Sequence, residues 1–79
     1  MIDTIKNKLQ TTYPEAHIVL HSSDEVHFDL TILDDAFNGA PLLNRHRAVY
    51  AALGDSLMQR IHALSIKAQT HSEAKQAEN

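Results

Sequence analysis

The sequence has 79 residues, which is enough for one small domain and leaves no room for a second. It contains no cysteine. That excludes a disulfide-supported fold, a zinc finger and an iron–sulfur protein that supplies its own thiolates. No apolar run approaches the roughly 20 residues that a transmembrane helix needs, and no signal-peptide pattern appears. We therefore expect a soluble, cytoplasmic protein.

Charge and histidine content indicate which classes of partner the protein could bind. Seven Lys and Arg against ten Asp and Glu give a formal net charge of −3 at pH 7, which argues against broad electrostatic binding to nucleic acid or anionic membrane. A local basic patch remains compatible with this balance. The six histidines, without cysteine, suit a protein that donates one or two imidazoles to a metal rather than a complete set of ligands.

The first half of the sequence predicts a helix over 2–12 and strands over 16–21 and 26–33. The strands follow from alternation of apolar and polar residues, and the polar alternates predict one solvated sheet face. The polar segment 22–25 is short enough to connect the strands as a hairpin. The helix follows from an apolar stripe at helical spacing, formed by Ile2, Ile5 and Leu9.

The second half predicts a helix over 42–59 and a strand over 61–69. Gly54 falls inside the helix, where glycine costs about 1 kcal/mol relative to alanine, so we expect a kink or a break there. His62 would begin the strand, in phase with its apolar face. Residues 71–79 are polar and lack an apolar stripe, which predicts a frayed helix or a flexible tail.

The predicted order is therefore α-β-β-α-β. An amphipathic helix on each side of a hairpin, followed by a closing strand, implies a two-layer α+β domain over residues 1–70. We expect the helices to cover one face of a three-stranded mixed sheet.

No catalytic pattern is present in the sequence. It has no nucleophile elbow, no glycine-rich phosphate loop and no HExxH motif. Asp34 and Asp35 are better explained as a solvated turn than as an acid/base pair. A chain this short also has little room for a substrate cleft, so we expect a protein that is not an enzyme.

A basic segment, Arg45-His46-Arg47, opens the second helix. Arginines at a helix N-terminus oppose the helix dipole, so nothing local favours them there. They would either bind phosphates or a partner's carboxylates, or form a solvated first turn. Arg60 and Lys67 would extend the same basic patch.

Four histidines are candidate metal ligands. His62 alone would be either a hydrogen-bonded residue at the rim of the core or a ligand. His17 and His21 lie about 13 Å apart along one strand, since each residue rises about 3.3 Å, so they cannot bind the same ion. His21 and His27 flank the hairpin turn and can approach each other.

Several segments together resemble the BolA-like protein family, in its subgroup with a short hairpin loop. The resemblance covers about residues 26–70, and its specificity comes from the separation between two motifs, RHRxVYxxL and IHALSIKAxT. The matching segments are His27-Phe28, Phe37-Asn38-Gly39, Arg45 to Tyr50 with Leu53, and Ile61 to Ala68 ending at Thr70.

The resemblance implies a core similar to class II KH domains, with a helix-turn-helix-like segment around residues 34–57. It also implies a monothiol glutaredoxin partner and a shared 2Fe–2S cluster, to which the glutaredoxin and glutathione supply sulfur and the BolA-like protein supplies imidazole. The family's C-terminal histidine ligand corresponds to His62. For the second ligand, His21 is nearest by position, and His27, which matches the HF motif, is the further candidate.

Two other functions remain open. BolA-like proteins are also associated with DNA-binding regulation of stress response, cell envelope and morphology, for which Arg45, Arg47, Arg60 and Lys67 would contact phosphates. A metal-free interaction module is the third possibility. Alone, the protein would be a monomer or a weak homodimer.

The C-terminal end departs from the family. Many members continue with Pro-x-Glu-Trp after the threonine, whereas this sequence has His71-Ser72-Glu73-Ala74. Without the tryptophan, a last helix lacks its hydrophobic anchor, so we expect a looser C-terminus.

Overall fold

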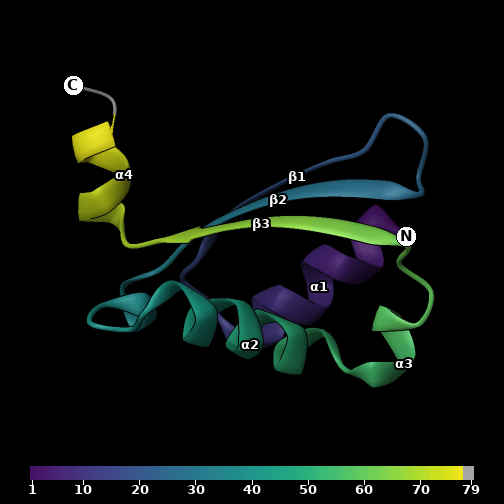
Figure 1. The fold of residues 1–79 in the computed structure, drawn as a ribbon, viewed down its shortest axis with the longest axis horizontal. Helices are drawn as coiled ribbons and strands as arrows, with labels where there is room; N and C mark the ends of the chain where they lie inside the picture. Colours follow the sequence, from purple (N-terminus) through teal and green to yellow (C-terminus); the bar gives the residue numbers. More distant parts are fainter. Residues whose placement is uncertain (78–79) are drawn as a thin grey trace.

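The computed structural model describes residues 1–77 and has the predicted α-β-β-α-β order, with three short helical additions (Figure 1). None of the helices in this range has the length and apolar character needed to cross a membrane. The elements are α1 (Ile2–Thr12), β1 (His17–His21), β2 (His27–Leu33), the 3-10 helix η1 (Asp35–Phe37), α2 (Leu42–Leu53), α3 (Asp55–Met58), β3 (Ala63–Gln69) and α4 (His71–Ala77).

The three strands form one mixed sheet in the order β1-β2-β3. β1 and β2 are the antiparallel arms of the hairpin, with His21 opposite Asp29. β3 runs parallel to β2, with His27 opposite Ala63. A parallel neighbour requires a crossover connection, and α2 and α3 provide it on the face that α1 also covers (Figure 1).

Alternation along the strands separates a buried face from an open one. Phe28, Leu30 and Ile32 of β2 are at most 2% exposed and pack against the helices, whereas Val19 on the other face is 50% exposed. The sheet therefore has one solvated face, as the alternation predicted. The remaining core residues are Ile5, Leu9, Phe37, Val49, Leu53, Leu57, Ile61 and Ala68.

Gly54 divides the predicted helix over 42–59 into α2 and α3. Its φ of 84° and ψ of 154° lie in a region that side chains with a Cβ avoid, so glycine is needed there. Its N–H donates to the carbonyl of Tyr50, ending α2, and its carbonyl accepts from Met58, starting α3. The predicted break at Gly54 is confirmed.

The strand predicted over 61–69 begins two residues later than expected, at Ala63. Turn hydrogen bonds from the N–H of Arg60 to Leu57 and of Ile61 to Met58 continue the helical segment up to Ile61. His62 therefore lies in the connection before β3 and not in the strand itself.

Residues 71–77 form α4, which turns toward the open face of the sheet (Figure 1). A capping box begins this helix: the N–H of Thr70 donates to Glu73 Oε1 at 2.8 Å, and the N–H of Glu73 donates to Thr70 Oγ1 at 3.1 Å. No residue of α4 is buried. The flexibility expected of this end stays a prediction, and residues 78–79 lie outside the described part of the chain.

Arg45 is a buried part of the fold, with 6% of its surface exposed. Its Nε donates to the carbonyl of Ala40 at 2.8 Å and its Nη1 to the carbonyl of Ala68 at 3.0 Å. Its Nη1 and Nη2 also bind Glu73 Oε1 and Oε2 at 2.7 and 3.0 Å. This guanidinium has no surface left for a phosphate, so the structure argues against the phosphate-binding role expected of Arg45.

The Arg45–Glu73 pair predicts a specific loss of stability in acid. Hydrogen bonds from Arg45, and then from Thr70, lower the pKa of Glu73 from 4.5 to about 2. The stabilisation from this carboxylate is therefore fully present above pH 4.5 and is lost as the pH falls through about 2. Glu73→Gln keeps the capping box but not the charge, and we expect it to lower Tm by roughly a few degrees at pH 6.

Thermal unfolding followed by circular dichroism between pH 6 and 2 measures this effect. The difference in Tm between the wild type and Glu73→Gln should shrink as the pH falls toward 2, where about half of the Glu73 carboxylates are protonated in the folded protein. Glu15→Gln, at an exposed glutamate outside this network, is the matched control and should leave the wild-type curve unchanged. A constant difference across the pH range would contradict the assigned role.

Candidate metal centre

Three of the candidate histidines lie at one end of the sheet. β1 is antiparallel to β2, so its last residue, His21, lies beside the start of β2. β3 is parallel to β2, so its first residue, Ala63, lies beside His27, and His62 immediately precedes it. The hairpin end of the sheet therefore gathers His21, His27 and His62, and all three are exposed.

His27 is held in a defined orientation by the hairpin loop. Its Nδ1 lies 2.8 Å from Asp24 Oδ2, although the imidazole is 71% exposed. An ionised carboxylate only accepts hydrogen bonds, so Nδ1 carries the proton and Nε2 presents its lone pair to solvent. A carboxylate on the other ring nitrogen is the usual means by which proteins orient a metal-binding histidine.

Asp24 is itself fixed by the backbone of the loop. Its Oδ1 accepts from the N–H groups of Val26 and His27 at 2.9 Å each, as in an Asx turn. These bonds, with the backbone bond from His27 contributing most, hold the pKa of Asp24 below its usual range. The Ser22 hydroxyl accepts from the N–H of Glu25 at 2.8 Å, and Glu25 takes a positive φ of 58°. The short loop is therefore a structured support for His27.

His62 and His21 lack comparable support. Within residues 1–77, neither side chain makes a hydrogen bond or an ion pair. His62 is placed by the chain around it, because Ile61 is buried at 8% exposure and Ala63 is paired with β2. Its imidazole is free to meet a partner.

The other histidines lie away from this end. His17 is at the opposite end of β1, His46 is half-buried in α2, and His71 begins α4. In the part of the chain that the structure describes, no three His, Cys, Asp or Glu side chains are grouped so that they could hold a metal ion.

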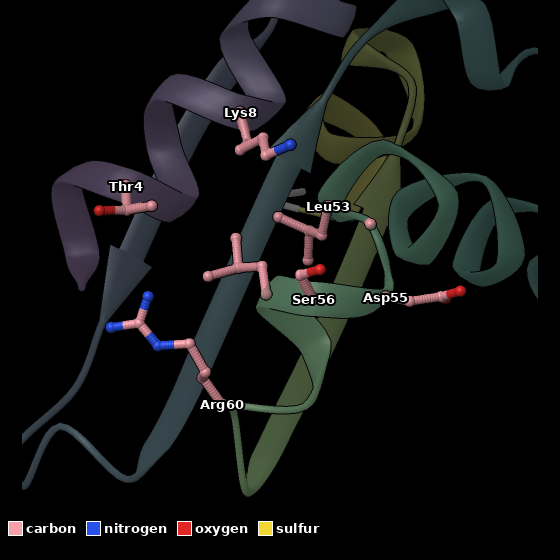
Figure 2. A pocket seen from close by; sticks show the side chains of 8 residues that line it. Thr4, Lys8, Leu53, Asp55, Ser56 and Arg60 are labelled. Atoms are coloured by element: carbon pink, nitrogen blue, oxygen red, sulfur yellow. The ribbon is translucent and has the colours of Figure 1, made fainter.

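The expected basic patch is not assembled into one surface. Lys67 is on the open face of β3, because its neighbours Ile66 and Ala68 face the core. Arg47 is on the solvent side of α2, which covers the other face of the sheet, since Arg45 and Val49 form the buried side of that helix. Arg60 follows α3 and faces α1 (Figure 2). In the segment Arg45-His46-Arg47, Arg45 is buried, so His46 is the only residue that is partly exposed beside Arg47 on α2.

Two residues important to the structure were not singled out from the sequence. Asp24 is identifiable only from its position three residues before His27, a spacing that suits a turn. Glu73 follows Thr70 in the pattern Thr-x-x-Glu, which is a recognisable capping-box signal.

Comparison with known proteins gives matches along most of the chain. A profile of the BolA-like protein family matches residues 5–73. SufE-like protein 1 of Arabidopsis thaliana, chloroplastic/mitochondrial, is 51% identical over 49 residues, which are 62% of this chain and 13% of that protein. The DNA-binding transcriptional regulator BolA of Escherichia coli K12 is 36% identical over 52 residues, which are 66% of this chain and 50% of that protein. This chain thus spans half or less of these relatives.

The fold is also shared with solved structures. BolA1 from Arabidopsis thaliana superimposes with a TM-score of 0.76 at 36% identity, covering 90% of this chain and 92% of that one. The profile match extends from α1 to the Glu73 that pairs with Arg45, so it includes every strand and the hairpin end described above. This chain belongs to the BolA-like protein family.

Proposed function

We propose that this protein is a non-enzymatic partner of a monothiol glutaredoxin, with which it shares a 2Fe–2S cluster in cluster assembly, trafficking or iron regulation. In this proposal the glutaredoxin and glutathione supply sulfur ligands and this chain supplies imidazole. Alone, it is a monomer or a weak homodimer without a cluster. The cytoplasmic location stays a prediction.

The observation that carries the proposal is the gathering of exposed histidines at the hairpin end of the sheet. Three strands bring His21, His27 and His62 to that end, and Asp24 fixes one of them with Nε2 outward. A ligand set completed by a second protein requires donors that are exposed and oriented before the partner arrives. All three histidines of the hairpin end are exposed, and His27 is also oriented by Asp24, which supports the proposal.

The donor chemistry also suits a shared cluster. This chain has no thiolate, so any cysteine ligand must come from the partner. Imidazole in place of thiolate raises the potential of a 2Fe–2S centre, as in Rieske proteins. A glutaredoxin complex with this chain would therefore differ in potential and in visible spectrum from the glutaredoxin alone.

For the second ligand, the structure favours His27 over His21. The carboxylate of Asp24 fixes the orientation of the His27 ring through Nδ1, as partners of metal-binding histidines commonly do. His21 has no such partner. His27 is also opposite Ala63, the residue next to His62, whereas His21 is on the far strand of the sheet.

The first experiment titrates this protein into a monothiol glutaredoxin with glutathione, iron and sulfide at pH 7.5, followed by visible absorption and circular dichroism. We expect a new spectrum that saturates near a one-to-one ratio. His62→Ala should abolish or alter that spectrum, because it removes an imidazole ligand. His17→Ala, at the opposite end of the sheet, is the control and should match the wild type. A His62→Ala spectrum identical to the wild type would remove His62 from the ligand set.

The choice between His27 and His21 is a separate prediction. His27→Ala should change the spectrum of the shared cluster, and His21→Ala should not. Asp24→Asn removes the charge that orients His27, and loss of such a supporting group typically weakens metal binding by about 10–100-fold. We therefore expect Asp24→Asn to accelerate cluster release without abolishing the spectrum. The reverse pattern, with His21 sensitive and His27 silent, would assign the second ligand to His21.

DNA-binding regulation is the alternative function. The observation in its favour is the similarity to the Escherichia coli regulator. Several features weigh against it: the net charge of −3, the burial of Arg45 and the separation of Arg47 from Lys67 by the sheet. α3 is a single turn of four residues, which is short for a helix that enters a major groove.

A measurement of duplex DNA binding at pH 7.5 tests this alternative function. If the protein binds DNA through phosphates, the affinity should fall steeply with added salt, and Arg47→Gln should reduce it severalfold. We expect no salt-dependent binding in fluorescence anisotropy at this pH. Binding that appears only below pH 6.5 would reflect protonation of the histidines and would not support a regulatory role.

A further inference from the structure

A hollow of about 310 Å³ lies between α1 and α3, on the helical side of the molecule (Figure 2). Its size is at the lower end of the range for small-molecule sites. None of the three histidines at the hairpin end lines it. The lining residues are Thr4, Lys8, Leu53, Gly54, Asp55, Ser56, Leu57 and Arg60.

Two cations from different elements approach this hollow. Figure 2 shows the Lys8 amine extending from α1 over the hollow and the Arg60 guanidinium reaching from the segment after α3 toward α1. A Cβ built on Gly54 would lie 3.9 Å from Lys8 Nζ, so the amine lies close to the junction of α2 and α3. Among residues 1–77, neither cation makes an ion pair with a carboxylate.

The one acidic lining residue does not neutralise them. The Asp55 carboxylate points away from the hollow, on the far side of α3 from Arg60 (Figure 2). Lys8 and Arg60 therefore leave two positive charges uncompensated beside one cavity. In a protein with a net charge of −3, this local excess favours an anionic occupant.

The floor and rim supply the remaining contacts. Leu53 is fully buried and Leu57 is 5% exposed, so together they form an apolar base that is fixed by the core. Ser56 lies at the rim, and Thr4 turns its methyl group toward the hollow and its hydroxyl away from it (Figure 2). An occupant would thus meet charge on two sides, and the Thr4 methyl and the methylene stems of Lys8 and Arg60 would be its apolar surroundings.

We propose that this hollow binds a small phosphate monoester with a short apolar body. A phosphate monoester carries about −1.5 to −2 charges at pH 7, which matches the two cations. The planar guanidinium of Arg60 suits paired phosphate oxygens and the Lys8 amine acts as a point charge. The Thr4 methyl and the methylene stems of Lys8 and Arg60 would contact the apolar body. A carboxylate, with one negative charge, would leave one cation unpaired.

The test uses the isolated protein and phenyl phosphate as the probe, followed by amide chemical shifts at pH 7.5. We expect one saturable site, with the shifts confined to residues 53–60 and to the turns of α1 that carry Thr4 and Lys8. The double variant Lys8→Gln/Arg60→Gln should weaken binding by at least about tenfold, as expected for the loss of two charge-assisted contacts.

A matched control removes the same total charge elsewhere. Lys6→Gln/Lys67→Gln changes two exposed lysines outside the hollow and should bind phenyl phosphate as the wild type does. Equal weakening in the two double variants would overturn the proposal, because it would reveal a general charge effect. If the first double variant fails to fold, Lys8→Arg, which keeps the charge, and Lys8→Gln make the same comparison.

Two further probes define the ligand class. Inorganic phosphate should bind at least severalfold more weakly than phenyl phosphate, since it does not cover the Thr4 methyl and the methylene stems of Lys8 and Arg60; equal affinity would overturn the apolar part of the proposal. A short DNA duplex should not shift the same amides. Shifts with the duplex but none with phenyl phosphate would overturn the proposal and assign the two cations to nucleic acid. No iron or glutaredoxin is present, so the outcome is independent of the proposed cluster.

Discussion

The structure depends on one buried cation. Taking a guanidinium out of water is costly unless it is hydrogen-bonded, and each of the three nitrogens of Arg45 donates to an acceptor, in three separate parts of the chain. It reaches the segment before α2, the end of β3 and the carboxylate of α4. Few other arrangements of the chain would bring these three acceptors to one guanidinium. The apolar core can tolerate small shifts, but this set of hydrogen bonds fixes how the C-terminal helix meets the sheet.

The register of the sheet likewise fixes the arrangement of the chain at the hairpin end. Because β1 is antiparallel to β2 and β3 is parallel to β2, the end of β1 lies beside the starts of β2 and β3. α2 runs back toward that end, and the break at Gly54 lets the chain turn there toward β3 instead of continuing as one straight helix (Figure 1). His27 and Ala63, which are 36 positions apart in the sequence, thus meet through backbone pairing. At that end His21 and His62 make no side-chain hydrogen bond within residues 1–77, and the imidazole of His27 is 71% exposed although it binds Asp24.

Periodicity in the sequence was sufficient to predict the main elements, because the core residues follow the spacing of helices and strands, although Leu42 and Leu43 at the start of α2 are exposed. Periodicity alone did not reveal that Arg45 is buried. The spacing does place Arg45 on the buried stripe of α2, because it precedes Val49 and Leu53 at intervals of four. A charged residue in such a stripe is buried only if a distant partner exists, and Glu73 is not identifiable from spacing. The role of Asp24 was equally hidden, since it depends on the loop geometry and not on any pattern.

The sheet has only three strands, and this has a consequence for the protein in concentrated solution. Both β1 and β3 are outer strands, each with one row of backbone donors and acceptors that no other described strand pairs. Proteins usually protect such edges with lysine, proline or a bulge. Here β3 has Lys67, but β1 is His-Ile-Val-Leu-His and carries no fixed charge. Because its sequence holds no lysine or proline, the edge of β1 is the place where two copies would begin to associate strand to strand.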